Sequence, residues 1–480
     1  MSETRETEAG VITSEFNQNE QRLKQILHPE ENFDIIIRRI QIGGRAAALY
    51  YMDGMVKDEL LEKVVESFFK LQETDMPKEA EAFTQELLPY TENELCQEID
   101  KLLKNLLSGV TVLLIDGYSQ AILMDLRTYP ARSVEEPEKD RVMRGSRDGF
   151  VETLIMNTAL LRRRIRSTDL RIRAVEIGAS SRTDIAVCYM ESRVDKVFLQ
   201  KVMNRLMSIE IDALTMNQES LGECIHRGSW LNPFPKFKYS ERPDTAAASV
   251  LEGNIAIFVD NSPAAMILPA TFFDIIEEAD DYYFPPVTGT YLRLSRFLGN
   301  LLALLLTPTW LLFLANPGLV PDWLAFVLDV EQANIPILWQ LLILELAIDG
   351  LRLASINTPN MLSTPLSVIA GIVMGDFATS SGWFAPQSML YMAFVSIATY
   401  TQASFELGYA LKFMRLILLV LTAFFGIWGY VAGLLLAVFC IVCNRTLSGK
   451  SYLAPLLPFN GSQLLQRFFR VSLPRSEKKP

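Results

Sequence analysis

The sequence predicts an N-terminal region of mixed helices and strands, built as two similar subdomains, followed by an all-α polytopic transmembrane domain. The first supporting observation is hydropathy, because the runs 297–315 and 416–444 hold no charged residue and are long enough to cross a bilayer. The second is charge, since residues 1–296 carry a net charge of −13 and the remainder +2. The third is a repeated strand pattern within the acidic part.

Composition excludes several classes of protein. A region as acidic as residues 1–296 is a poor partner for nucleic acid, because phosphate binding depends on cation-rich surfaces. The five cysteines are odd in number and scattered, as expected of reduced thiols. Cys440 and Cys443 form a C-x-x-C within an apolar run, with no second pair or histidine nearby, so we interpret them as small helix residues. We expect no metal, no cofactor and no nucleic-acid partner.

The first 30 residues hold few large apolar side chains and are rich in Glu, Gln, Asn and Thr. Such a composition is typical of a disordered terminus, so we expect a mobile leader over residues 1–30. The N-terminus has neither a basic segment nor an apolar one, and therefore no signal peptide is predicted.

Two segments of the acidic region share one pattern. Each has a glycine, a six-residue apolar strand and a turn that begins with aspartate, at 109–117 and at 253–261. Each continues into a second apolar strand, at 121–126 and at 264–268. Both segments therefore indicate β-hairpins.

The hairpins predict two similar subdomains, over residues 31–132 and 147–290, with a charged, proline-broken linker at 133–146. Periodicity in the first subdomain predicts strands at 33–42 and 45–52 and a helix at 57–71. In the second, it predicts a helix at 148–166, strands at 170–177 and 184–190, and a helix at 194–209.

The second subdomain also contains a basic cluster, made of Arg162, Arg163, Arg164, Arg166, Arg171 and Arg173. One reading is a contact with RNA or phosphate. The favoured reading is a solvated helix face whose arginines pair with nearby carboxylates, because the surrounding domain is acidic.

Residues 291–450 are expected to hold about six membrane-spanning helices. The apolar segments are 297–315, 323–348, 364–380, 388–404, 413–427 and 429–444. Lysine and arginine avoid short translocated loops, and base-free loops alternate here with basic loops that carry Arg352, then Lys412 and Arg415. Both termini are therefore placed in the cytoplasm, with residues 451–480 as a cytoplasmic tail and with Arg293 and Arg296 anchoring the first helix.

One of these segments, 364–380, contains Pro365, Gly371, Gly375 and Asp376. It could cross the membrane or re-enter it, and a broken helix is tolerated only where protein or a water cavity surrounds it. We expect a crossing, because otherwise the basic loop at Lys412 would fall outside.

Four ionisable residues are candidates for an ion pathway: Glu345, Asp349, Arg352 and Asp376. Charge at membrane depth is costly and by default indicates function. Glu345, Asp349 and Arg352 follow at spacings of four and three, so they share a helix face that could line such a pathway. An alternative of equal weight places Asp349 and Arg352 at the interface as a local ion pair, with only Glu345 deep.

A long ordered series of motifs carries a family resemblance. The motifs are Arg147–Glu152, Asn157–Arg164, Asn232–Lys236, Tyr239–Asp244, Leu251–Gly253, Pro269–Phe272, Asp280–Tyr283 and Tyr452–Pro458. Over about residues 32–460 the chain resembles the A subunits of GerA-type spore germinant receptors, and within that family a divergent branch. Where we expect glutamates in the receptors, this chain has Gln340 and Asp349, and it lacks an arginine near Asn357, which disfavours direct nutrient response.

The resemblance implies a multi-pass protein of the inner membrane of the bacterial endospore, with both termini on the core side. In that family the A subunits form oligomers that conduct ions, and the divergent branch is associated with other spore membrane proteins and with cation release. The implied partners are further copies of this chain, other germination proteins, monovalent cations and the lipid bilayer.

The motif residues Pro235, Glu241, Arg242, Pro243 and Asp244 admit two readings. A catalytic one would pair the carboxylates of Glu241 and Asp244, but the sequence offers no nucleophile, metal set or phosphate loop beside them. The favoured reading is structural: Pro243 fixes the backbone, Asp244 caps a helix from Thr245 to Leu251, and Arg242 joins segments or subunits through a carboxylate.

We therefore expect a cation-conducting channel subunit of spore germination rather than an enzyme. The alternative is a non-conducting scaffold that recruits or stabilises germination proteins. A secondary transporter ranks third, because the hydrophobic segments show no convincing inverted repeat.

Overall fold

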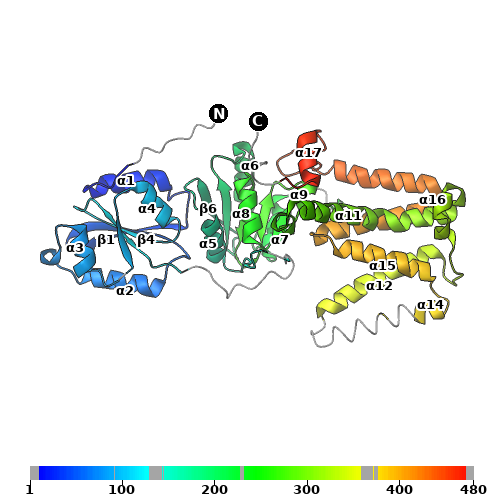
Figure 1. Cartoon of the computed structure of the whole chain (residues 1–480), viewed down its shortest axis with the longest axis horizontal. Helices are drawn as coiled ribbons and strands as arrows, with labels where there is room; N and C mark the ends of the chain where they lie inside the picture. Colours follow the sequence, from blue (N-terminus) through cyan, green and yellow to red (C-terminus); the bar gives the residue numbers. More distant parts are fainter. Residues whose placement is uncertain are drawn as a thin grey trace. The chain divides into compact units, whose positions relative to one another are not determined.

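The computed structural model describes residues 10–90, 92–128, 143, 145–226, 232–357, 371 and 377–471. The chain forms two compact units (Figure 1). The α/β unit comprises Met1–Arg227 and Phe237–Pro269, and the helical unit comprises Gly228–Lys236 and Ala270–Pro480.

The first half of the α/β unit is a five-stranded sheet in which all neighbours are antiparallel. The spatial order is β1 (Ile35–Ile42), β2 (Arg45–Met52), β4 (Thr111–Ile115), β5 (Ala121–Met124) and β3 (Asn93–Cys96). The predicted strands at 33–42 and 45–52 and the predicted hairpin after Gly109 are all present.

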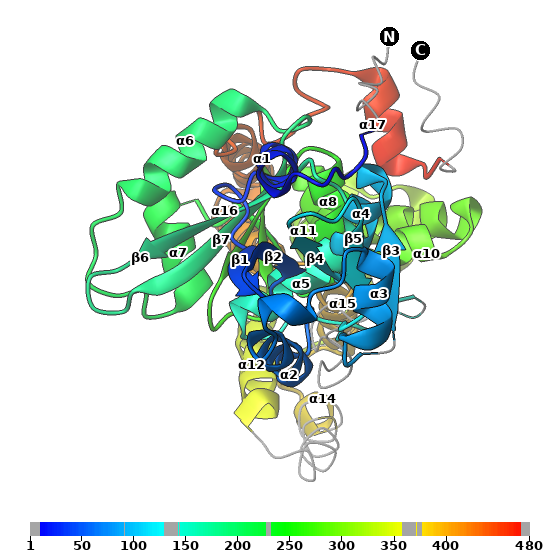
Figure 2. The same ribbon diagram turned by 90° about the vertical axis from the view of Figure 1, so that its left-hand side faces the viewer.

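Helices cover both faces of this sheet. On one face α1 (Phe16–Leu27) and α4 (Ile99–Leu106) pack against alternate strand residues such as Ala48 and Tyr50. On the other, α2 (Asp58–Phe69) and α3 (Ala80–Glu86) pack against Ala47 and Leu49. Figure 2 shows α1 and α2 on opposite sides of β1 and β2. Because both faces are covered, every residue of β4 is buried.

The second half repeats this architecture element by element. Its sheet has the order β6 (Leu170–Ile177), β7 (Thr183–Met190), β9 (Ile255–Val259), β10 (Ala265–Leu268) and β8 (Lys238–Ser240). Its helices are α5 (Leu154–Arg164), α6 (Lys196–Met207), α7 (Asn217–Ile225) and α8 (Pro243–Leu251). The chain order matches the first half from α1 to β5, so the predicted pair of similar subdomains is present.

The repeat extends to individual hydrogen bonds. Asp116 follows β4 and accepts from the backbone of Phe16 at the start of α1, while Asp260 follows β9 and accepts from the backbone of Leu154 at the start of α5. Asn19 bonds both backbone groups of Thr13, and Asn157 bonds both backbone groups of Val151. The first residues of each subdomain are thus tied to its central hairpin.

The prediction of a mobile leader over residues 1–30 was wrong for residues 16–27. These form α1, which buries Phe16, Leu23 and Leu27 against the first sheet. The helix is strongly polar on its outer face, and only docking on the sheet makes its four apolar residues sufficient to hold it.

Two other boundaries also differ from expectation. The helix expected at 148–166 spans only Leu154–Arg164. The second subdomain was expected to reach residue 290, but its last strand ends at Leu268 and Ala270 already belongs to the helical unit. The predicted linker at 133–146 lies almost entirely outside the described residues.

A buried ion pair joins the two subdomains within the α/β unit. Arg162 of α5 donates to both carboxylate oxygens of Asp34, at 2.8 and 3.1 Å, and their side chains are 1% and 2% exposed. The Asn32 side chain completes the junction, because its oxygen accepts from the backbone of Ile172 at 3.0 Å. Arg162 is therefore paired with a carboxylate, as favoured for the basic cluster, but it is buried rather than solvated.

Two more arginines of the cluster, Arg171 and Arg173, bind Glu31 from the same edge of the second subdomain. Burial alone would raise the pKa of Glu31, but the hydrogen bonds from Arg173 and Arg171 bring that pKa below its ordinary value. The junction thus contains three arginine contacts to two carboxylates.

The helical unit begins with α9 (Phe272–Ile276) and α10 (Asp280–Tyr283) and continues with α11 (Pro286–Ala315). Two short 3-10 turns, Pro317–Leu319 and Asp322–Leu328, precede α12 (Ile337–Asn357). Among the described residues, the helices that follow are α14 (Ala378–Ser380), α15 (Pro386–Tyr400), α16 (Phe405–Val442) and α17 (Gly461–Phe468).

The long helix α16 is two helices joined at Gly426. This glycine has φ 57° and ψ −133°, which side-chain-bearing residues rarely adopt. The chain folds back there, since a Cβ on Gly433 would lie 2.6 Å from Leu418 and Gly429 adjoins Leu421. The two expected segments 413–427 and 429–444 are therefore helical, with the reversal two residues before the expected loop at Trp428.

Other predicted segments need correction. The segment 323–348 is not one helix, because α12 begins only at Ile337 and then continues to Asn357. Arg352 consequently lies within α12, and Lys412 and Arg415 lie within α16, although all three were expected in basic loops. The segment 364–380 lies outside the described residues except for 371 and 377–380.

The polarity of the helical unit is inverted relative to a water-soluble fold. Among the described residues, α11 and α16 are each long and apolar enough to cross a membrane. Large apolar side chains such as Leu346, Phe424 and Trp428 are exposed, whereas Gln340, Glu345 and Arg415 are buried. This arrangement indicates association with a membrane.

The subdomain junction generates a stability prediction. Asp34→Ala leaves the Arg162 guanidinium buried without its carboxylate, so the free energy of unfolding should fall by about 3–5 kcal/mol in urea titrations of the purified chain. Glu66→Ala removes one partner of the exposed pair with Lys70 and should change little. Equal unfolding midpoints for the two variants would show that the junction does not depend on this pair.

Candidate functional site

The helical unit contains a buried ion pair between α12 and α16. Glu345 of α12 is 4% exposed. Its Oε1 accepts from Arg415 Nε at 2.7 Å and from Arg415 Nη2 at 2.5 Å. A two-pronged arginine contact of this kind holds both the position and the charge of the carboxylate.

Lys412 binds the other side of the same carboxylate. Its Nζ lies 3.2 Å from Glu345 Oε2 and 3.4 Å from the backbone oxygen of Glu345, and it also pairs with Asp349 Oδ2. Three oxygen atoms of α12 therefore surround one buried ammonium group.

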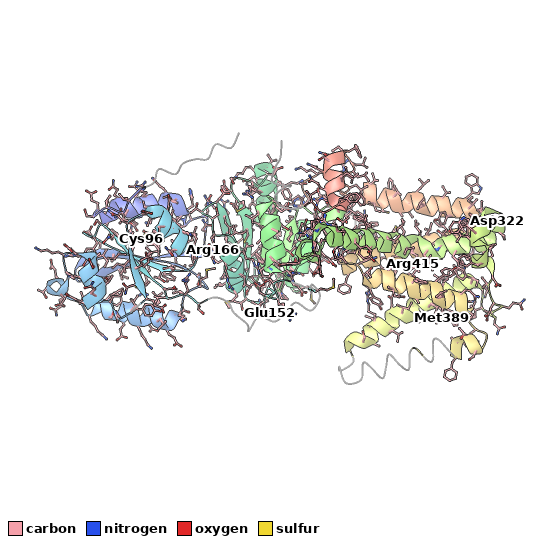
Figure 3. All side chains as sticks on the ribbon, in the orientation of Figure 1. Cys96, Glu152, Arg166, Asp322, Met389 and Arg415 are labelled. Atoms are coloured by element: carbon pink, nitrogen blue, oxygen red, sulfur yellow. The ribbon has the colours of Figure 1, made fainter. Side chains whose placement is uncertain are left out.

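Helical spacing explains why these groups meet. Glu345 and Asp349 are four residues apart on α12, and Lys412 and Arg415 are three apart on α16, so each pair faces the other helix. Arg415 also donates through Nη1 to the backbone oxygen of Ala303 in α11. Figure 3 shows Arg415 among the helices of this unit. The guanidinium thus links three helices.

A cavity of about 20 Å³ lies beside the cluster, which is enough for about one water-sized occupant. Its lining includes Glu345, Asp349, Arg352, Lys412, Arg415 and Ser396. Arg352 stacks against three rings, with its guanidinium carbon 4.9 Å from the Tyr400 centroid, 5.3 Å from that of Phe405 and 5.5 Å from that of Tyr409.

Three of the four predicted pathway residues, Glu345, Asp349 and Arg352, therefore line one cavity, while Asp376 lies outside the described residues. Neither sequence reading anticipated their partners. Asp349 pairs with Lys412 rather than with Arg352, and Glu345 is not left alone. Lys412 and Arg415 were missed because they were taken as loop markers.

The motif at Arg242 is structural in its contacts. The Arg242 side chain is fully buried, donates to both carboxylate oxygens of Asp244 and reaches the backbone oxygen of Ser146 at 2.9 Å. Pro243 is the first residue of α8 and Arg242 is its N-cap, so the prediction that Asp244 caps a helix from Thr245 to Leu251 was wrong and Asp244 lies in the first turn. The Glu241 backbone oxygen accepts from Phe150.

Pro235, the remaining motif residue, is buried in the helical unit. The adjacent Phe234 packs in a core cluster with Leu411 and Tyr452. Burial also lowers the pKa of Lys236, the residue that follows Pro235. The motif residues are therefore divided between the two units, with Glu241–Asp244 in the α/β unit.

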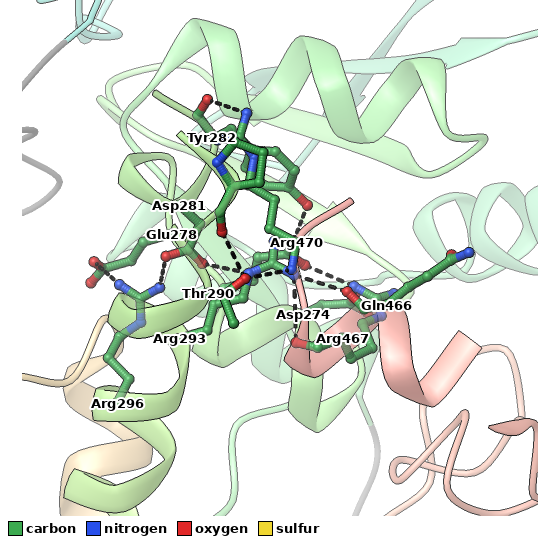
Figure 4. A network of polar contacts seen from close by, with 12 residues as sticks. Asp274, Glu278, Asp281, Tyr282, Thr290, Arg293, Arg296, Gln466, Arg467 and Arg470 are labelled. Atoms are coloured by element: carbon green, nitrogen blue, oxygen red, sulfur yellow. Dashed lines mark hydrogen bonds and ion pairs between the residues drawn. The ribbon is translucent and has the colours of Figure 1, made fainter. Parts of the chain in front are cut away.

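A second charged network lies at the start of α11 (Figure 4). The fully buried carboxylate of Asp281 accepts from Arg293 Nε at 3.0 Å and also pairs with Arg296. Glu277 and Glu278 bind the same two arginines, at 2.5 and 2.7 Å respectively. The two arginines predicted to anchor the first membrane helix are thus fixed by three carboxylates.

The C-terminal helix α17 joins this network. Arg467 pairs with Asp274 and Glu277, each at 2.8 Å, and Arg293 donates to the backbone oxygen of Gln466 at 3.0 Å. The ring of Phe468 packs on Phe297 of α11. The part of the tail expected simply to be cytoplasmic is therefore docked on the start of α11.

Comparison with known proteins gives consistent matches. A family model described as Bacillus/Clostridium GerA spore germination protein matches residues 21–480. The chain is 36% identical over 463 residues to stage V sporulation protein AF of Bacillus subtilis strain 168, covering 96% of this chain and 94% of that relative. It is 27% identical over 454 residues to spore germination protein KA of the same strain, covering 93% and 83%.

Among solved structures, the N-terminal domain of the A subunit of the Bacillus megaterium spore germinant receptor GerK3 matches at 24% identity. The TM-score is 0.40, and the match covers 55% of this chain and 98% of that chain. The resemblance expected from the sequence motifs is confirmed by the family model and by the relatives.

The tail contacts predict local dynamics. Arg467→Gln removes two partly exposed ion pairs, so hydrogen exchange in residues 461–470 should accelerate by about fivefold, a small effect because solvent screens these groups. Gln463→Ala, an exposed change on the same helix, should leave exchange unaltered. Identical exchange rates in both variants would mean that the ion pairs do not dock the tail.

Proposed function

This chain belongs to the GerA spore germination family, and we propose from that premise that it is an oligomeric, cation-conducting membrane protein of spore germination. The observation that carries the proposal is the cluster of the buried Glu345, Lys412 and Arg415 with the half-buried Asp349, inside a unit with an apolar exterior. Ionisable groups at such depth are expensive, and in membrane proteins they mark pathways for ions and protons.

We propose a multi-pass arrangement in the inner membrane of the spore, with both termini on the core side. Contacts at one end of the helical unit support it, because Trp310 donates to Val327 and Asn334 donates to Gly382. The loops that meet there, 316–336 and 381–387, contain no lysine or arginine. By the positive-inside rule this end is the translocated one.

The opposite end of the helical unit collects the basic residues. Arg293 and Arg467 meet there, and Arg352 packs against Tyr400 at the end of α15. Residues 352 and 381 therefore belong to opposite ends, in keeping with a crossing by the segment 364–380. The proposed topology has six crossings: α11, α12, that segment, α15 and the two halves of α16.

An oligomer is part of the proposal because one copy of the cluster is nearly neutral. Glu345 and Asp349 are offset by Lys412 and Arg415, so a single subunit in this arrangement gives cations little attraction. Several copies around a symmetry axis would form a ring of available carboxylates once these ion pairs separate. The proposed partners are thus further copies of this chain, monovalent cations and other germination proteins of the same membrane.

The alternative is a non-conducting scaffold without catalytic activity. The same cluster favours a scaffold in one respect, because each of its four charged side chains has a partner of opposite charge. The contacts of Arg415 also fix α11, α12 and α16 relative to one another. A scaffold would recruit or stabilise germination proteins and would carry no current.

Topology can be tested by labelling single cysteines in a cysteine-free background. Ser381→Cys should react with an impermeant maleimide applied to intact cells, because it lies in a base-free loop and is exposed. Ser462→Cys, also exposed but on α17, should react only after the membrane is permeabilised. The reverse labelling pattern would overturn the proposed topology.

Conduction can be tested by ion flux into liposomes, which sums rare openings over time. The proposal expects the purified protein to pass K⁺, and Glu345→Gln to lower the flux or the preference for cations over anions, because it removes a charge while keeping the shape. Glu331→Gln, an exposed carboxylate of the same unit, is the matched control.

The Glu345→Gln variant and the wild type must first elute as the same assembly in detergent. No flux above empty liposomes would favour the scaffold. Equal flux and selectivity in Glu345→Gln and wild type would remove Glu345 from the pathway.

A further inference from the structure

We propose that Glu345 and Asp349 form a binding site for a monovalent cation, and that the Lys412 ammonium occupies this site as a tethered blocker. The inference deepens the proposed function by naming the ion site and the group that closes it. It rests on the geometry around Lys412 Nζ.

The donor atoms are those that suit a hard cation. Lys412 Nζ lies 3.2 Å from Glu345 Oε2 and 3.4 Å from the Glu345 backbone oxygen, and it pairs with Asp349 Oδ2. Channels use backbone carbonyl oxygens to replace the hydration shell of K⁺ and rings of aspartate or glutamate to select cations, and this site combines both kinds of oxygen. The ammonium is itself a compact unit charge that such an oxygen set accepts.

The site keeps its shape without Lys412, because other groups hold its walls. Arg415 binds the opposite oxygen of the Glu345 carboxylate, Oε1, through Nε and Nη2, and is itself fixed on the Ala303 backbone oxygen. Asp349 stands one helical turn further along the rigid helix α12. Arg415 is therefore a positioning residue, whereas Lys412 is the occupant.

There is also space for the exchange. The cavity of about 20 Å³ is lined by Glu345, Asp349 and Lys412, and by the hydroxyl-bearing Ser396 and Thr399. A lysine side chain has a flexible four-carbon stem and a compact, strongly hydrated charge. Its ammonium can therefore move away from the oxygens more readily than the planar guanidinium of an arginine could. Withdrawal of the ammonium frees Glu345 Oε2 and Asp349 Oδ2 from Lys412, and Glu345, Asp349 and Arg415 then carry a net charge of −1 together, which favours a cation.

The test is cation-dependent thermal stabilisation of the full-length protein in detergent, which reports binding independently of conduction. Lys412→Met removes the ammonium and keeps the length of the side chain. KCl should raise the Tm of this variant on the order of 2–4 °C relative to N-methyl-D-glucamine chloride at equal ionic strength, once K⁺ exceeds its Kd about fivefold. The wild type should show no such difference, because Lys412 already fills the site.

Two controls locate the effect. Lys450→Met, an exposed lysine of the same unit, should behave like the wild type. Adding Asp349→Asn to Lys412→Met should abolish the K⁺ effect, because one of the two charged ligands is lost. Lys412→Ser replaces Lys412→Met if the latter does not remain folded.

The proposal is overturned if K⁺ fails to stabilise the lysine variant, or stabilises it and the wild type equally. It is also overturned if the Asp349→Asn double variant keeps the full effect. K⁺-specific stabilisation without flux in liposomes would support the site and contradict the channel. Flux in the wild type without K⁺ binding by the lysine variants would support the channel and contradict the site.

Discussion

The energetic cost of burying charge governs the helical unit. A lone carboxylate such as Glu345 inside an apolar bundle costs several kcal/mol, and pairing offsets that cost only when the geometry is good. Arg415 supplies this geometry by joining Glu345 to the Ala303 backbone, so that α11, α12 and α16 meet at one point. The second network also pairs its buried charges, because Asp281 and two glutamates bind Arg293 and Arg296 at the start of α11. The helices therefore meet through polar contacts as well as through buried apolar side chains such as Trp310, Leu341 and Leu419, while many other large apolar residues face outward.

The α/β unit follows a different constraint, namely the covering of two sheets whose central strands are apolar on both faces. The duplicated order of helices and strands meets this need twice, and Asp116 and Asp260 bind the first helix of each copy to its hairpin. The buried pair of Asp34 and Arg162 then holds the copies together. A charged junction of this kind fixes how the two subdomains align, because moving one along the other would leave Arg162 buried without its carboxylate.

Local patterns made part of this structure predictable. The hairpins after Gly109 and Gly253 depend on alternation and turn chemistry within a dozen residues, and the strand at 170–177 was predicted to the residue. The helix α1 was missed because its few apolar residues have meaning only once the sheet is present. Lys412 and Arg415 were misplaced for a related reason. Their partner Glu345 lies 67 and 70 residues away, and a rule that treats basic residues as loop markers contains no information on such pairing.

In the proposed mechanism, the interior charges of the helical unit are paired at rest and become available to ions when one pair separates. The reversal potential of the purified protein in a planar bilayer tests this claim most directly. Under a tenfold KCl gradient, a cation-selective pathway should give discrete currents that reverse near the K⁺ equilibrium potential, about 59 mV from zero. Currents that reverse at zero, or near the Cl⁻ potential, would contradict a pathway lined by Glu345 and Asp349, and a silent bilayer would favour the scaffold.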